Sequence, residues 1–341
     1  KAVHGPTYPV MGYVETLEAC LSHPHYKAPL KKLQGRGYAS GFWFNAGGES
    51  SAQVNITEDG NVVVTTGHPD IGGSRASIAN ITAELLGIDI NRVSVLIGDT
   101  ATIGFSNLTG GSRVLFASAL VVTESTNQVI DILKDRASKI WNIDKEAIEW
   151  ENGEARPAGD NAGKFKPLSL VELAEQATPT GGPIGAGHQV NTVGAEGGFA
   201  THICDVEVDI ELGIARVIRY TAAQDVGKAI HPAYVEGQLQ GGVVQGIGWA
   251  LNEEYIYNKE GKLDNPGFLD YRIPVCSDLP MIDTILVEVP NPQHPQGVRG
   301  VGEVPIVPPL SAIANAIYNA IGTRFYSLPM SPPKVLEKIS D

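Results

Sequence analysis

One glutamate, Glu303, has a position in the sequence that suits a group that transfers protons. Glu303 follows a glycine turn at residues 300–302 and precedes a pattern typical of an apolar helix. Its neighbours at positions 301, 304, 306 and 307 are valine or isoleucine. Apolar surroundings disfavour the charged form of a carboxylate, which makes such a group a proton acceptor near neutral pH. The alternative interpretation is a glutamate in a first helical turn that interacts with the helix dipole.

Three glycine turns precede predicted helices, at Gly72-Gly73-Ser74, Gly110-Gly111-Ser112 and Gly300-Val301-Gly302. Such turns can present backbone N–H groups, with a helix dipole behind them, to a phosphate or another anion. Glycine matters there because a Cβ would block the close approach of a ligand. The alternative is that these glycines only supply positive φ angles in ordinary loops.

An isolated amide, Gln245, interrupts a run of small and apolar residues between 241 and 248. An amide offers both a donor and an acceptor and can therefore recognise a heterocycle. The alternative is a core or interface glutamine whose polar atoms are satisfied by the backbone.

Several other kinds of site are excluded or disfavoured. No GxGxxG turn follows a first strand, and a phosphate-binding P-loop is absent, so standard nicotinamide or ATP binding is disfavoured. The closest histidine pair, His23 and His25, lies in the predicted N-terminal linker, and no metal site is expected there. Cys20, Cys204 and Cys276 are far apart, which rules out a CxxC knuckle.

The composition limits the classes of partner that the protein is expected to bind. The 341 residues carry a formal charge of −13, and no stretch combines basic and aromatic residues, so nucleic acid is not an expected partner. No apolar run reaches the about 18 residues of a membrane span, and the first thirty residues lack a signal pattern. We therefore expect a cytoplasmic protein.

The apolar periodicity predicts alternating strands and helices. In the first half we expect a hairpin at Asp59-Gly60, a helix closed by Gly87, a strand at 93–97, a long helix from about 112 to 141, a hairpin at Asn152-Gly153 and a capping box at Ser169 and Glu172. In the second half the strongest pattern is a helix that opens at Pro308-Pro309, carries Leu310, Ile313, Ala314, Ile317 and Ile321 on one stripe, and closes at Gly322.

The two halves repeat one another. In each, a predicted strand leads to Asp-x-Gly, at Asp70 and at Asp225, and a helix follows. This predicts an α+β fold with two similar lobes of mixed or antiparallel sheet packed with helices. We expect an N-terminal linker and helix at 1–34, a first lobe at 35–190 and a second lobe at 191–341. The helix pattern at 13–33 has no obvious core of its own and looks like a connection from an upstream part.

Taken together, the motifs resemble the C-terminal half of the molybdopterin-binding subunit of the xanthine oxidase family. The resemblance runs from about residue 35 to the end and lies in the order of its motifs: Gly67-His68-Pro69-Asp70-Ile71-Gly72, Gly98-Asp99-Thr100, Thr109-Gly110-Gly111-Ser112-Arg113, Asp225-Val226-Gly227, Gln238 to Gly246, and Gly300-Val301-Gly302-Glu303.

This resemblance implies a site and a cofactor. Glu303 corresponds to the family's active-site glutamate, preceded by Gly302, and Gln245 to the glutamine that approaches the pterin. The turns at Gly72, Gly73 and Ser74 and at Gly110, Gly111 and Ser112 correspond to those that bind the molybdopterin cytosine dinucleotide carrying molybdenum. Many relatives have Gly-Gln-Gly at residues 72–74, so the amide contact expected there is lost, and Gly73 contributes only backbone.

The resemblance also implies a multi-subunit enzyme. The family's subunit is about twice this length, and a split arrangement resembles the medium molybdopterin subunit of bacterial nicotinate dehydrogenase. We then expect a second, larger molybdopterin subunit, an iron–sulfur subunit and an FAD subunit. The implied reaction hydroxylates an N-heteroaromatic such as nicotinate with oxygen from water, with Glu303 as the base. An aldehyde- or carbon-monoxide-oxidising relative and a non-catalytic scaffold are the alternatives.

Overall fold

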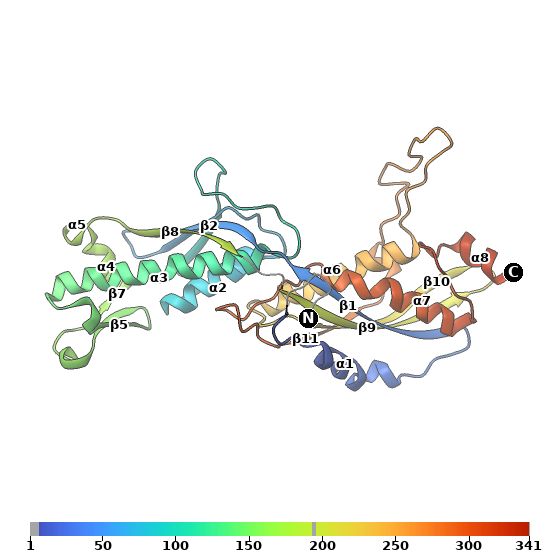
Figure 1. Ribbon diagram of the computed structural model, residues 1–341, viewed down its shortest axis with the longest axis horizontal. Coiled ribbons are helices and arrows are strands. Elements are labelled where there is room, and N and C mark those ends of the chain that lie inside the picture. The colour runs from blue at the N-terminus through green and yellow to red at the C-terminus, as the bar shows by residue number, and fades with distance from the viewer. Residues whose placement is uncertain (1–6, 193–195, 341) are drawn as a thin grey trace. The chain divides into compact units, whose positions relative to one another are not determined.

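The computed structural model describes residues 7–192 and 196–340 and divides into two compact units. Unit 1 comprises the described parts of residues 1–45, 196–292 and 299–341, and unit 2 those of 46–195 and 293–298. Each unit has its own sheet, its own helices and its own apolar core. The predicted α+β class is confirmed (Figure 1).

The main sheet of unit 2 has the strand order β8-β2-β3-β4, formed by β8 (Ile184–Thr192), β2 (Gly48–Ile56), β3 (Val62–Thr66) and β4 (Val93–Ile97). Strand β2 is antiparallel to both β8 and β3, whereas β4 is parallel to β3. Helix α2 (Ser74–Leu86) connects the parallel strands, and the long helix α3 (Val114–Trp141) packs against β2 and β8. Fully buried residues such as Val64, Ile78 and Val122 form the core between them.

A small second sheet completes unit 2. It contains β5 (Ile148–Glu151), β6 (Glu154–Pro157) and β7 (Leu168–Ser169), followed by α4 (Leu170–Glu175) and α5 (Ala177–Thr180). The predicted hairpin is confirmed, because Asn152 and Gly153 connect β5 and β6 with φ angles of 52° and 77°. Two successive positive φ angles define the type I′ turn that suits a two-residue hairpin. The predicted capping box of Ser169 and Glu172 is also formed, at the start of α4.

The sheet of unit 1 has the order β1-β9-β10-β11, formed by β1 (Gln34–Asn45), β9 (Glu196–Asp209), β10 (Ile214–Asp225) and β11 (Ile282–Val287). Strand β9 is antiparallel to β1 and β10, and β11 is parallel to β10. Helix α6 (Pro232–Leu251) connects the parallel strands, and α7 (Val307–Ile321) packs against β1 and β9. Helix α8 (Pro332–Ser340) follows α7.

The two main sheets share one topology. Each has an antiparallel edge strand, an antiparallel hairpin, a connecting helix, a parallel fourth strand and a later helix across the first two strands. The predicted duplication is therefore confirmed at the level of strand order and direction. The copies differ in where the edge strand comes along the chain, since β1 precedes its hairpin and β8 follows its own.

The N-terminal segment is part of unit 1 and not a separate linker, which differs from the boundaries predicted from sequence. Helix α1 (Tyr13–Ser22) is shorter than the predicted 13–33, and a 3-10 turn (Pro24–Lys27) follows it. Three of their side chains, Thr16, Cys20 and His25, are buried. Strand β1 also belongs to unit 1 because it pairs with β9 along its whole length. The separation of more than 150 residues between these partners hid the pairing from local sequence patterns.

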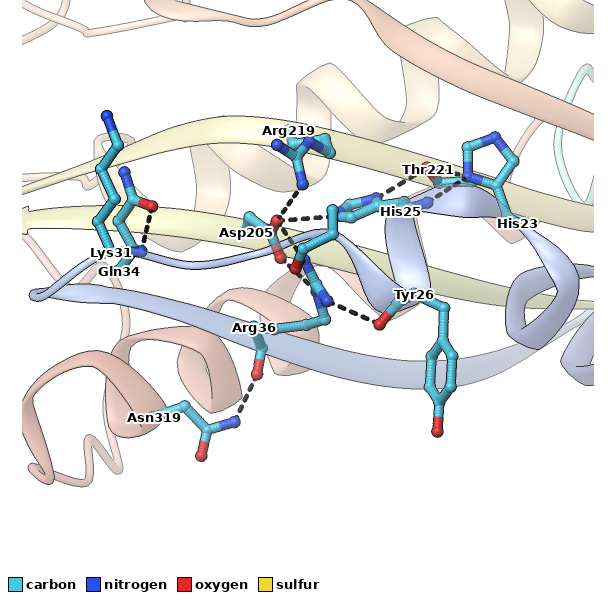
Figure 2. A network of polar contacts seen from close by, with 11 residues as sticks. His23, His25, Tyr26, Lys31, Gln34, Arg36, Asp205, Arg219, Thr221 and Asn319 are labelled. Carbon is cyan, nitrogen blue, oxygen red and sulfur yellow. Dashed lines mark hydrogen bonds and ion pairs between the residues drawn. The ribbon is translucent and has the colours of Figure 1, made fainter.

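A buried polar network fixes this segment to the sheet (Figure 2). The fully buried carboxylate of Asp205 on β9 accepts hydrogen bonds from Arg36 at 2.7 and 2.8 Å and from Arg219 at 3.1 Å. The Nε2 atom of His25 lies 3.1 Å from the same carboxylate. Arg36 also donates to the carbonyl of Tyr26 at 2.7 Å. Burial would raise the pKa of Asp205, but hydrogen bonds from His25 and Arg36 outweigh it and lower the pKa.

Helix α7 lies closely against the sheet because glycines of β1 make room for it. An added Cβ at Gly37 would lie 1.9 Å from the carbonyl oxygen of Ala312. The buried residues of α7 are Pro308, Pro309, Ala312, Ile313, Ala316 and Ile317, whereas the predicted stripe is 310, 313, 314, 317 and 321. Residues 304–321 are long and apolar enough to cross a membrane, but these buried residues identify α7 as a core helix.

Candidate functional site

Glu303 lies at the start of the segment that leads into α7. It is the N-cap residue of a 3-10 turn (Val304–Ile306) that continues directly into the helix. The predicted position, on a loop before a helix N-terminus, is confirmed. The following residues Val304 and Pro305 are buried, whereas Glu303 itself is partly exposed. The apolar surroundings expected from its neighbours in sequence are therefore incomplete.

A buried ion pair anchors the base of the Glu303 loop. Arg299 and Asp225 are both fully buried, and Nε of Arg299 lies 3.2 Å from Oδ2 of Asp225. Arg299 also donates to the carbonyls of Gly197 and Val289, both at 3.3 Å. Asp225 accepts from the backbone N–H of Gly12 at 2.8 Å. Burial raises the pKa of Asp225, although the hydrogen bond from Gly12 and the charge of Arg299 act in the opposite direction.

Two buried amides hold the next residues of the loop. The Oδ1 atom of Asn45, at the end of β1, accepts from the N–H of Gly300 at 2.8 Å. The Nε2 atom of Gln224, near the end of β10, donates to the carbonyl of Val301 at 3.1 Å. Sequence reasoning noticed the Asp225 motif but missed Asn45, Gln224 and Arg299. Their partners Gly300, Val301 and Asp225 lie 255, 77 and 74 residues away from them. These residues fix the backbone that presents Glu303.

Gln245 and Glu303 belong to elements that pack against each other. Gln245 lies on α6. Two buried glycines of this helix, Gly242 and Gly246, pack against the segment that follows Glu303. An added Cβ at Gly242 would lie 2.4 Å from Cγ of Pro305, and one at Gly246 would lie 2.6 Å from Cγ of Pro309. The two predicted site residues are thus brought to one junction of unit 1. Gln245 is exposed, which contradicts the alternative of a core glutamine.

The outer face of α6 contains a second pair of glycines, at positions 237 and 241. Both residues are exposed, and an added Cβ at either would meet no atom within 4 Å. With Gln245 they follow the four-residue spacing of one helix face. Within residues 7–192 and 196–340, neither a positive φ angle nor packing requires glycine at these two positions. The face is therefore open for the close approach of another molecule.

The glycine turn before α2 is formed as predicted. Gly72 and Gly73 have φ angles of 69° and 78°, and Gly73 is the N-cap of α2. L-amino acids rarely adopt these angles, which explains the two glycines. The turn already contains one carboxylate, since Asp70 accepts from the N–H of Arg75 at 3.1 Å and lies 3.4 Å from the hydroxyl of Ser74. The amide of Arg75 is therefore not free for a phosphate.

The turn before α3 is anchored by a buried arginine. Gly111 and Ser112 have φ angles of 66° and 54°. Arg113, which is buried, donates to the carbonyls of Gly47 and Glu49 at 2.6 Å. Gly110 lies beside this turn, where an added Cβ would meet the side chain of Leu108 at 2.9 Å.

A hydrogen-bonded bridge links the two sequence motifs of unit 2. The hydroxyl of Ser50 accepts from Arg113 at 3.0 Å and lies 2.8 Å from Nε2 of His68. Burial, followed by the charge of Arg113, lowers the pKa of His68 to about 4, so this imidazole is neutral at neutral pH. The predicted residues thus form two groups, with Gly302, Glu303 and Gln245 in unit 1, and residues 72–74 and 110–112 in unit 2.

Comparison with known proteins adds an independent finding. The sequence profile of the molybdopterin cofactor-binding domain matches residues 23–280. The putative xanthine dehydrogenase molybdenum-binding subunit of Escherichia coli (strain K12) is 29% identical over 314 residues, which are 88% of this chain and 41% of that protein. The nicotine 6-hydroxylase large subunit of Paenarthrobacter nicotinovorans is 29% identical over 299 residues, with 84% and 36% covered.

Solved structures share the fold. Quinoline 2-oxidoreductase from Pseudomonas putida 86 aligns with a TM-score of 0.80 and 25% identity, over 96% of this chain and 43% of that one. This chain spans less than half the length of each of these relatives. It belongs to the molybdopterin cofactor-binding domain family, and it corresponds to part of the molybdenum-binding subunits of the xanthine oxidase family.

Proposed function

We propose that this chain is the part of a molybdenum hydroxylase subunit that carries the catalytic base and one wall of the cofactor site. The observation that carries the proposal is the open face of α6 beside the Glu303 segment. Exposed glycines inside a helix cost about 0.5–1 kcal/mol each relative to alanine. Gly237 and Gly241 carry this cost although no contact among the residues that the structure describes requires glycine there. A flat group that approaches the helix backbone, such as a pterin, explains it.

Other predicted site residues also suit a pterin cofactor. The exposed amide of Gln245 offers a donor and an acceptor to a pterin edge. The turns before α2 and α3 place positive-φ residues at the N-termini of two helices, where the helix dipole favours an anion such as a phosphate of a dinucleotide. The bound molybdenum cofactor supplies the redox chemistry, and the protein supplies orientation and proton transfer.

Glu303 acts as the general base in this proposal. Its carboxylate accepts a proton from the water whose oxygen is added to the substrate. The loop must hold the carboxylate in one place, because a displacement of about 1 Å can lower a rate about 100-fold. Arg299, Asn45 and Gln224 provide that rigidity through the contacts described above. They are positioning residues, since they touch the loop backbone and not the reacting atoms.

We further propose an N-heteroaromatic substrate of the nicotinate type. Two relatives carry names that refer to such rings, nicotine 6-hydroxylase and quinoline 2-oxidoreductase. A carbon beside a ring nitrogen is electron-poor and accepts oxygen from water. Relatives named aldehyde oxidoreductase and carbon monoxide dehydrogenase support the second candidate, an aldehyde- or carbon-monoxide-oxidising enzyme. Turnover measured with nicotinate, an aldehyde and carbon monoxide separates the two candidates.

The proposal includes further subunits and a cofactor form. We propose a larger molybdopterin subunit, an iron–sulfur subunit and an FAD subunit in the cytoplasm, and molybdopterin cytosine dinucleotide as the cofactor. Among the residues that the structure describes, no group of three His, Cys, Asp or Glu side chains could hold a metal. We also propose that electrons from the substrate leave through the iron–sulfur and FAD subunits.

The test replaces the base in the intact complex. We expect Glu303→Gln to retain molybdenum and pterin at wild-type levels and to lower turnover by at least about 100-fold, the range for loss of a general base. Glu337→Gln, which removes an exposed carboxylate on α8, is the matched control and should keep both. Unchanged turnover in Glu303→Gln would exclude the base role. If the wild-type complex contained no molybdenum or pterin, this chain would instead be a scaffold.

A further inference from the structure

The connection between α6 and β11, residues 252–281, forms an ordered arm that projects from unit 1 (Figure 1). Two asparagine side chains give it a defined shape. Asn258 accepts from the N–H groups of Glu260 and Lys262, both at 3.0 Å. Asn265 accepts from the N–H of Ile256 at 2.9 Å and donates to a backbone carbonyl at 2.7 Å. The arm is therefore fixed by local hydrogen bonds and not by an apolar core of its own.

The arm presents large apolar side chains to its surroundings. Eight of them are between 52% and 98% exposed, namely Tyr255, Ile256, Tyr257, Phe268, Leu269, Ile273, Val275 and Met281. The neighbouring side chains Phe268 and Leu269 are the most exposed, at 98% and 95%. Soluble proteins rarely leave so many apolar groups uncovered on one ordered projection unless it binds a partner. Aromatic and aliphatic anchors of this kind typically fill the centre of an interface.

We propose that the arm docks into the polypeptide that supplies the part of the relatives absent from this chain, which rests on the proposed function because that function needs such a partner. The aligned region takes up 84–88% of this chain but only 36–41% of the two relatives. More than half of each relative is thus additional polypeptide that must pack against the matched part. An interface of that kind is large and apolar.

Charge argues against a second copy as the occupant. The arm contains six acidic and three basic residues, and the whole chain has a formal charge of −13. Two copies joined through their arms would bring like charges together, which disfavours association. The expected occupant therefore offers an apolar groove bordered by basic side chains.

Photo-crosslinking tests the proposal in the intact complex purified from the protein's own host cells. Phe268 is replaced by p-benzoylphenylalanine, an aromatic analogue that fits this fully exposed position, and crosslinked peptides are identified by mass spectrometry. We expect a peptide whose sequence aligns with the part of the relatives outside the matched region. The same probe at Tyr326, a 93% exposed aromatic residue outside the arm, is the control and should not yield that peptide. Crosslinks to a second copy, to residues 46–192, or none at all would overturn the proposal.

A paired substitution gives a second measurement. The double variant Phe268→Ser with Leu269→Ser should lower the yield of the co-purified partner at least tenfold while the unfolding temperature of this chain stays unchanged. An unchanged yield would overturn the docking role. Neither measurement depends on molybdenum or turnover, so a crosslink to the expected partner in a complex without molybdenum would reject the proposed function and leave the docking proposal standing.

Discussion

Replacing either of two adjacent glycines of α6, Gly241 and Gly242, by alanine is predicted to change the stability of the protein in opposite directions. In Gly242→Ala the new Cβ would lie 2.4 Å from Cγ and 3.0 Å from Cβ of Pro305. In Gly241→Ala the new Cβ would meet nothing within 4 Å. Both changes add the same helix propensity, about 1 kcal/mol. The difference between the two variants therefore isolates the clash.

The expected size of that difference follows from the geometry. Ordinary contact begins at 3.4 Å, so the Pro305 ring must move by 1.0 Å, the difference between 3.4 and 2.4 Å. The ring is part of the backbone and cannot rotate away, and overpacking of this kind costs about 1–3 kcal/mol. We expect Gly241→Ala to be about 0.5–1 kcal/mol more stable than the parent, and Gly242→Ala to be about 1–3 kcal/mol less stable than Gly241→Ala.

The assays are urea unfolding and turnover of the intact complex. Because Pro305 lies two residues after Glu303, we expect Gly242→Ala to lower turnover by about 10- to 100-fold with molybdenum retained. Gly241→Ala should lower the cofactor content, since its methyl group occupies the space that we assign to the pterin. Equal stability of the two variants would refute the packing argument. Full cofactor content in Gly241→Ala would refute the assignment of the open face.

Further predictions concern charge and capping. Asp205→Asn should destabilise the protein by about 3–5 kcal/mol, because it leaves the buried charge of Arg36 without its partner, whereas Asp283→Asn, at an exposed position of the same sheet, should change stability by less than about 0.5 kcal/mol. Because the pKa of Asp205 is lowered in the folded protein, its stabilising effect is complete above its unfolded pKa of about 3.9 and is lost as pH falls through its folded pKa. The unfolding temperatures of the parent and of Asp205→Asn should therefore converge in acid. Ser169→Ala should cost about 1 kcal/mol in urea unfolding because it removes the N-cap of α4. The backbone N–H of Ser169, which this variant keeps, is the main cause that lowers the pKa of Glu172 to about 2, and the Ser169 hydroxyl, which the variant loses, adds to it through a hydrogen bond of 2.9 Å. The part of the stability gap that comes from this hydroxyl bond should narrow as pH falls from about 4 to 2.

The sequence alone determined the elements whose stabilising contacts are local. The hairpin at Asn152-Gly153, the capping box at Ser169 and Glu172, and the helix end at Gly322 all depend on residues within five positions of one another. Their φ angles and hydrogen bonds follow from residue type, so the patterns predicted them. The motif order was also sufficient to indicate the family.

The tertiary structure decided which segments share a unit and how the site is held. Strand β1 belongs with β9 because their backbones pair, and no local pattern encodes a partner 153 residues away, as for Phe44 and Gly197 within that ladder. The anchors of the Glu303 loop, Asn45 and Gln224, come from strand ends that only folding brings to that loop. Burial also depends on packing, which is why Glu303, apolar in its sequence neighbours, is partly exposed. Long-range pairing and burial are properties of the whole chain, whereas caps and turns are properties of a few neighbouring residues.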